Sequence, residues 1–110
     1  YIRSLQASDV ETLLALFDDN ASIEDPVGTE LREGKSALRE FYSVACEGVL
    51  SAALSGAPRL AGNEVAFPFT VTAGTVGEEL TINIIDVFKF NEAGKVVSMR
   101  AFWGPNNIGS

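Results

Sequence analysis

The spacing of apolar residues changes near Gly48, and this change constrains the fold of the 110-residue chain more than any other feature. Before it, apolar side chains recur at the three- and four-residue spacing of amphipathic helices, and after it they alternate as in half-buried strands. No repeat or linker divides the chain. We therefore predict one α+β domain over residues 1–110, in which a curved antiparallel sheet packs against N-terminal helices.

Caps and turns suggest where the elements begin and end. Ser8-Asp9-Val10-Glu11 fits a capping box, and the helix after it would carry an apolar stripe from Val10 to Phe17. Residues 1–5 are expected to end an earlier helix, so we expect further residues before Tyr1. A short extended segment at 21–26 and a turn at 34–36 lead into a second helix. The predicted strands are 51–57, 64–73, 80–90 and 95–103.

Composition excludes several classes of chemistry. The chain has no histidine and one cysteine, Cys46, which excludes Ser-His-Asp systems, His-ligated metals and an internal disulfide. Fifteen acidic and eight basic residues give a net charge of -7, the wrong sign for binding nucleic acid. The sequence has no apolar run of ~20 residues and no signal-peptide layout, so we expect a cytoplasmic protein without membrane attachment. No phosphate-binding loop or metal cluster is present, and no cofactor is expected.

An acidic residue interrupts the apolar face of the predicted 80–90 strand. A one-residue shift of register would turn that whole face outward, so the alternation predicts that Asp86 points inward. An ionised carboxylate buried without a partner is costly and usually binds a proton instead. Two interpretations stay open: a structural acid that is paired or turned outward by a bulge, and a protonated acid that donates a hydrogen bond in an apolar pocket. The face reads Ile82, Ile84, Asp86, Phe88 and Phe90.

A second acid, Asp25, shares its strand parity with Ile23 and Val27 and is directed toward the interior. Because Asp-Pro is common in turns, a purely structural role is the other interpretation. The two tyrosines of the chain, Tyr1 and Tyr42, are also compatible with ordinary core positions in which each hydroxyl has a partner. Two inward carboxylates and a phenol in an apolar cavity would suit proton transfer next to a carbonyl. One acid would then serve as base, and the neutral acid would stabilise the oxyanion.

Taken together, these segments resemble the ketosteroid isomerases, which belong to the cone-shaped, nuclear-transport-factor-two-like or SnoaL-like α+β superfamily. The resemblance extends over essentially the whole chain, and the combination of Tyr1, Asp25 and Asp86 is its most specific part. Its strongest stretches are Tyr1-Ile2, Asp9-Val10-Glu11, Ile23-Glu24-Asp25-Pro26-Val27-Gly28, Phe41-Tyr42, Ile84-Ile85-Asp86-Val87-Phe88-Lys89-Phe90 and Ser98-Met99-Arg100-Ala101-Phe102-Trp103.

The resemblance implies an enzyme that moves the double bond of a 3-oxo-Δ5-steroid into conjugation by transferring a proton from C4 to C6. Asp25 matches the general base, and Tyr1 and a protonated Asp86 match the two donors to the C3 oxygen. Tyr42 matches a tyrosine that supports the catalytic phenol, whereas Phe17 replaces a further tyrosine of some members. The family is typically dimeric, so a homodimer is expected. Positions matching the substrate pocket are Phe67, Phe69, Trp103, Val27 and Met99.

Two other classes of function remain open. Another enzyme of the same fold, such as a polyketide cyclase or an epoxide hydrolase, would act on a small apolar substrate. An epoxide hydrolase of this type needs an Asp-Arg-Asp group, and the parity of Arg100, opposite to that of Trp103, directs it away from the pocket. A non-catalytic module that binds a hydrophobic ligand would not need two inward acids.

Overall fold

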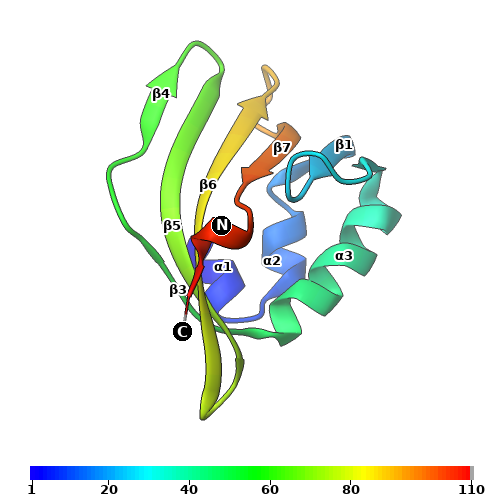
Figure 1. Cartoon of the computed structure of the whole chain (residues 1–110). Helices are drawn as coiled ribbons and strands as arrows, with labels where there is room; N and C mark the ends of the chain where they lie inside the picture. The colour runs from blue at the N-terminus through cyan, green and yellow to red at the C-terminus, as the bar shows by residue number, and fades with distance from the viewer. Residues whose placement is uncertain (110) are drawn as a thin grey trace.

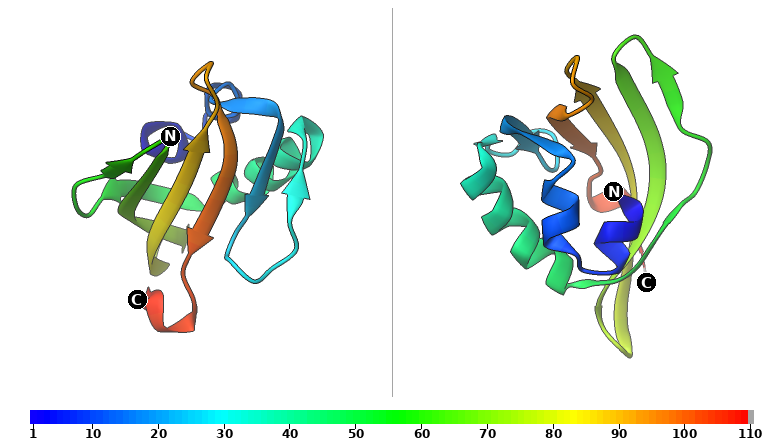
Figure 2. Two further views of the ribbon diagram at one scale, coloured as in Figure 1. Left: turned by 90° about the horizontal axis from the view of Figure 1, so that it is seen from above. Right: turned by 180° about the vertical axis from the view of Figure 1, so that it is seen from behind.

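The computed structural model describes residues 1–109, which form a strongly curved sheet with three helices on its concave side (Figure 1). Views from above and behind show the same arrangement, with the long strands bending around the helices (Figure 2). None of the helices in this range is long and apolar enough to span a membrane. The elements are α1 (Ile2–Gln6), α2 (Val10–Leu14), β1 (Phe17–Glu24), β2 (Arg32–Glu33), α3 (Lys35–Glu47), β3 (Val49–Leu54), β4 (Arg59–Ala61), β5 (Glu64–Thr75), β6 (Glu78–Phe90), β7 (Val96–Phe102), the 3-10 turn η1 (Pro105–Asn107) and β8 (Ile108–Gly109).

The sheet follows the order β2-β1-β7-β6-β5-β3, with β4 added beside β5 and β8 beside β6. Its centre is the β5–β6 hairpin, which pairs continuously from Glu64 opposite Lys89 to Thr75 opposite Glu78. All these pairs are antiparallel except β1 with β7, which run parallel. The predicted α+β class and curved antiparallel sheet are thus confirmed, with the parallel β1–β7 pair as the one departure.

The core lies between the concave face of the sheet and the helices. On α3, Leu38, Tyr42 and Cys46 are buried at four-residue spacing, which places them on one face of the helix. On β6, alternation holds as predicted, because Asp86 and Phe88 are buried while Ile85 is 49% exposed. The predicted parity of β6 is therefore confirmed, and Asp86 lies in the core.

The predicted start of the helix after Ser8, which is α2 in the structure, is wrong in one detail. Asp9, not Ser8, is the N-cap of α2, and its side chain accepts a hydrogen bond from the Thr12 N–H. Ser8 adopts a positive φ of 55°, and its hydroxyl donates instead to the main-chain oxygen of Cys46. Tertiary contact with α3 therefore displaces the capping box that the local sequence suggests.

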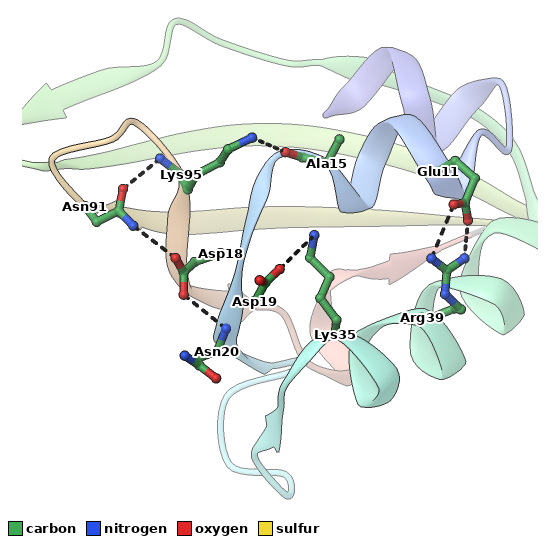
Figure 3. A network of polar contacts seen from close by, with 9 residues as sticks. All are labelled: Glu11, Ala15, Asp18, Asp19, Asn20, Lys35, Arg39, Asn91 and Lys95. Atoms are coloured by element: carbon green, nitrogen blue, oxygen red, sulfur yellow. Dashed lines mark hydrogen bonds and ion pairs between the residues drawn. The ribbon is translucent and has the colours of Figure 1, made fainter.

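The predicted helical stripe ends early, because α2 stops at Leu14 and Phe17 begins β1. The ammonium group of Lys95 donates to the Ala15 main-chain oxygen at 2.7 Å, and the Val96 N–H donates to the Leu16 oxygen at 2.9 Å. Both bonds take up carbonyl groups at the end of α2, and the one from Lys95 to Ala15 is drawn in Figure 3. The bond from Val96 also starts the parallel pairing of β1 with β7. The strand that leads to Asp25 is fixed in this way.

The remaining differences concern strand limits. The strand predicted at 51–57 runs from Val49 to Leu54, and the other three predicted strands lie within two residues of β5, β6 and β7. The short strands β2, β4 and β8 were not predicted, since two or three residues carry no detectable alternation. They are recognised by their pairing with β1, β5 and β6, which only the folded sheet shows.

Candidate active site

A cavity of about 220 Å³ opens between α3 and the concave face of the sheet. Its walls come from α1, α3, β5 and β6, and they are mainly apolar. The polar side chains on the wall are those of Tyr1, Asp25, Tyr42 and Trp103. Two of the three residues predicted to be catalytic therefore face one cavity, together with the predicted supporting tyrosine.

Tyr1 and Tyr42 form a pair within the wall of this cavity. Their hydroxyl oxygens are 3.0 Å apart, so that either group can donate to the other. The ring of Tyr1 also contacts Phe67, Phe69 and Phe88 edge-on, at centroid distances of 6.0, 6.3 and 4.9 Å. Burial, followed by the neighbouring Tyr42 and Asp86, raises the pKa of Tyr1 well above its ordinary value. This direction keeps the phenol protonated, so it can act as a hydrogen-bond donor.

Asp86 is 1% exposed, and within residues 1–109 neither carboxyl oxygen has a hydrogen-bond partner. Its strand is regular here, with Asp86 opposite Phe67 on β5 and Ala101 on β7. Burial raises the pKa of Asp86 well above its ordinary value, and the charge of Asp25 raises it further, whereas the nearby Tyr1 hydroxyl opposes this change. The protonated form is therefore favoured. Within the described part of the chain, β6 has no bulge at Asp86 and no arginine pairs with it, so the Tyr1 hydroxyl is the nearby polar group.

Asp25 follows the end of β1 and reaches the cavity from the other side. The indole N–H of Trp103 donates to its Oδ1 at 2.8 Å. Burial raises the pKa of Asp25, while the bond from Trp103 and the charge of Arg32 act in the opposite direction. Asp25 is thus held as a hydrogen-bonded carboxylate next to an apolar space, where its proton affinity is increased over that of an exposed aspartate.

The two acids differ in a way that matters chemically. Within residues 1–109 neither oxygen of Asp86 is hydrogen-bonded, and the nearby Tyr1 hydroxyl only partly offsets the effect of burial, whereas Asp25 has the Trp103 indole and a nearby cation, Arg32. When two acids are held in such different surroundings, the less stabilised one keeps its proton and the other ionises. The arrangement can therefore supply a base, Asp25, and a neutral donor, Tyr1, in the cavity wall. The second neutral acid, Asp86, is buried behind this wall and does not line the cavity.

The predicted pocket residues divide into two groups. Phe69 and Trp103 line the cavity. Phe67 is buried against Tyr1 but is not part of the cavity wall, Met99 is completely buried, and Val27 borders a separate hollow on the other side of Trp103. Phe17 packs against the rings of Tyr42 and Phe88, at 5.8 and 6.0 Å.

Two features of the site were not found from the sequence. Trp103 was predicted to line the pocket, but its bond to Asp25 joins residues 78 positions apart, and no local pattern signals it. Arg32 lies with its guanidinium carbon 4.8 Å from the centre of the Phe41 ring, and Phe41 lines the cavity. The Gly-Thr-Glu-Leu loop before Arg32 has no periodicity from which this position could be predicted.

Comparison with known proteins shows the family. A family model described as a SnoaL-like domain matches residues 1–99. The chain belongs to the SnoaL-like family. The steroid Delta-isomerase of Nocardioides simplex is 33% identical over 108 residues, which cover 98% of this chain and 87% of that protein. The epoxide hydrolase LasB of Streptomyces lasalocidi is also 33% identical, over 94% of this chain but only 39% of its own length.

A solved structure agrees with this assignment of the SnoaL-like domain. SalBIII, described as an epoxide hydrolase/cyclase-like enzyme with a role in pyran ring formation in the polyether salinomycin, superposes with a TM-score of 0.89. It is 33% identical, and the match covers 99% of this chain and 88% of that one. The relatives of this SnoaL-like domain are thus enzymes of at least two reaction types, isomerisation and epoxide opening.

Proposed function

We propose that this SnoaL-like domain is a steroid Δ-isomerase. The observation that carries the proposal is the contrast between two acids near one apolar cavity. Asp86 is buried with neither oxygen hydrogen-bonded to any of the described residues, and Asp25 is hydrogen-bonded and faces the cavity. The steroid isomerase relative, which matches 98% of the chain, supports the same function.

The reaction requires only proton movement. The carboxylate of Asp25 removes a proton from C4 of a 3-oxo-Δ5-steroid, and the C–H electron pair forms a dienolate with its charge on the C3 oxygen. Tyr1 and Asp86 donate hydrogen bonds to that oxygen. Asp25 then returns the proton to C6, the C3 carbonyl re-forms, and the remaining double bond is conjugated with it. A positioned base contributes about 10²–10⁴-fold to such a rate.

The size of the cavity limits how a steroid would bind. Its volume of about 220 Å³ is below the ~300–1,000 Å³ of typical ligand pockets. The reacting ring would therefore be enclosed, while the rest of the steroid extends past the opening. A ring carbonyl placed beside Tyr1 would lie on the side of the cavity nearest Asp86, since the Tyr1 ring packs against Phe67, which pairs with Asp86 across β5 and β6, and against Phe88 on the same face of β6.

The convex face of the sheet supports the proposal of a homodimer. Pro68, Ile85 and Phe102 pair across β5, β6 and β7 and form an apolar row, in which Ile85 is 49% and Phe102 40% exposed. A second copy packing on this face would remove the row from water. Light scattering on the purified protein tests this, since a mass equal to one chain would contradict it.

Epoxide opening is the second candidate, because LasB and SalBIII are as similar in sequence as the isomerase is. A neutral Asp86 could protonate an epoxide oxygen while Asp25 removes a proton from the attacking water or hydroxyl. Arg100, however, is exposed and pairs with Glu24, so it does not complete an Asp-Arg-Asp group at the cavity. We therefore place isomerisation first.

The experiment follows the absorbance of the conjugated enone that forms from a β,γ-unsaturated 3-ketosteroid. We expect turnover by the wild type and a loss of about 10²–10⁴-fold in Asp25→Asn, with steroid binding retained. Steroid binding without turnover would indicate a binding module. Turnover of an epoxide but not of the steroid would favour the second candidate. An Asp25→Asn variant that keeps more than about a tenth of the activity would exclude Asp25 as the base.

A further inference from the structure

The turn that carries Asp25 is closed by the side chain of the residue before it. Oε2 of Glu24 accepts a hydrogen bond from the Gly28 N–H at 3.0 Å, which links the two ends of the 25–27 segment. Oε1 of the same carboxylate accepts from Nε of Arg100 at 3.2 Å. With its single carboxylate, Glu24 therefore closes the turn at Gly28 and also ties the turn to strand β7 through Arg100.

Strand β7 holds the turn at two further points. The Val27 N–H donates to the Ala101 main-chain oxygen at 2.8 Å, and the indole of Trp103, just after β7, donates to Asp25. Gly28, whose N–H donates to Glu24, has a φ of 101°, a conformation that residues with a side chain rarely adopt. The position of Asp25 thus depends on how the turn docks on β7.

Glu24 and Asp25 are adjacent and have different surroundings. Asp25 lines the cavity, whereas the side chain of Glu24 is 22% exposed and contacts Arg100, whose own side chain is 49% exposed. Arg100 in turn stacks on Phe102, with its guanidinium carbon 5.1 Å from the ring centre. Glu24 therefore acts on the turn from outside the cavity and has no contact with the space where a substrate would lie.

We propose that Glu24 is a positioning residue, which holds the 25–28 turn on β7 so that the Asp25 carboxylate meets the Trp103 indole and faces the cavity. The effect of this residue on turnover rests on the proposed isomerase function. Its effect on the position of Asp25 does not, because the contact between Asp25 and Trp103 can be observed without a substrate.

Trp103 is the only tryptophan in the chain, so its indole N–H gives a single cross-peak in a ¹H–¹⁵N correlation spectrum. A hydrogen bond to a carboxylate shifts this peak and slows exchange of the indole hydrogen with solvent. Asp25→Ala gives the reference position for an indole without its partner. The peak in each variant then reports how much of the contact between Trp103 and Asp25 remains.

Three variants separate the two bonds of Glu24. Glu24→Ala removes both, and we expect the indole peak to move toward its position in Asp25→Ala and its hydrogen to exchange faster. Glu24→Gln keeps one acceptor oxygen, and Arg100→Met removes only the bond to β7, so each should give a smaller change. The matched control is Glu11→Ala, which also breaks an exposed pair between a glutamate and an arginine, Arg39, away from the turn.

Activity provides the second measurement. A displacement of a catalytic group by about 1 Å can cost on the order of 10²-fold in rate. We expect Glu24→Ala to lower kcat about 10- to 100-fold with little change in KM, because the apolar wall is untouched. Glu24→Gln should recover part of the loss, and Glu11→Ala should match the wild type in both constants.

The two measurements distinguish the two proposals. If the wild type does not isomerise the steroid, the proposed function is wrong, and the indole peak alone decides the role of Glu24. If Glu24→Ala does not fold, Glu24→Gln and Arg100→Met still test it. The positioning role is excluded if the indole peak of every folded variant stays at its wild-type position, or if Glu11→Ala moves it equally.

Discussion

The hydroxyl oxygens of Tyr1 and Tyr42 lie 3.0 Å apart, although 41 positions separate the two residues. Only one of them can be the donor within this bond. If the Tyr1 hydroxyl donates its hydrogen bond to the oxyanion of a substrate, the Tyr42 hydroxyl has to donate to the Tyr1 oxygen. The two phenols therefore have unequal roles, and substitution of each should have a different effect.

Tyr42→Phe should lower kcat by at most about tenfold, because a single hydrogen bond contributes about 0.5–1.5 kcal/mol. Tyr1→Phe removes the donor itself and should cost about 10²–10³-fold. The enone assay at saturating steroid measures both. Equal losses in the two variants would instead show that Tyr42, which also lines the cavity, contacts the substrate directly.

Asp86 offers a second test of the oxyanion donors. Asp86→Leu replaces a buried, unpartnered carboxyl with an apolar group, so the protein should stay folded while kcat falls about 10²–10³-fold. Asp86→Asn keeps an N–H donor and should lose less. Circular dichroism checks the fold of each variant before the assay. Unfolding of Asp86→Leu would show that the carboxyl is structural.

The sequence predicted the position of Asp86 well because β6 is paired on both sides. A regular strand between two neighbours keeps its alternation, so the inward position follows from parity alone. Asp25 lies beyond the end of β1, where parity no longer applies, and its position depends on Glu24 and on Trp103. Phe17 shows the same limit, since Lys95 and Val96 bind the end of α2 from the β6–β7 turn and β7.

The stability of the protein should depend on the protonation of Asp86. Its pKa is raised by folding, so above the ordinary aspartate pKa of about 3.9 the unfolded chain releases a proton that the folded chain keeps. The free energy of unfolding then falls as the pH rises, by up to about 1.4 kcal/mol per pH unit, until the folded pKa is passed. Asp86→Asn lacks this contribution, whereas the contribution of Asp25, whose pKa burial also raises, remains.

Urea denaturation at several pH values from about 4 upward measures this effect. The difference in unfolding free energy between Asp86→Asn and the wild type should grow in favour of the variant as the pH rises. A constant difference would mean that Asp86 ionises as readily in the folded protein as in the unfolded chain. Asp19→Asn is the control, since it makes the same chemical change in a side chain that is 91% exposed.

Arg32 should influence the pH at which the proposed base works. Its charge lowers the pKa of Asp25, against the larger effect of burial, and it is held over the Phe41 ring at the cavity wall. A base acts only when it is ionised, so kcat/KM should fall as the pH drops through the pKa of Asp25. In Arg32→Met that pKa rises, and the acid limb of the profile should move to higher pH.

The substitution to methionine keeps apolar contact with Phe41, so the loss of charge is the main change. Arg39→Met removes an arginine that pairs with Glu11 on the surface and does not affect the pKa of Asp25, so its acid limb should stay at the wild-type pH. The profile of kcat/KM against pH is measured for the wild type, Arg32→Met and Arg39→Met. A limb that stays in place in Arg32→Met, or moves to lower pH, would mean that the cation does not stabilise the Asp25 carboxylate. A limb that moves equally in Arg39→Met would assign the effect to net charge rather than to the position of Arg32 beside the base.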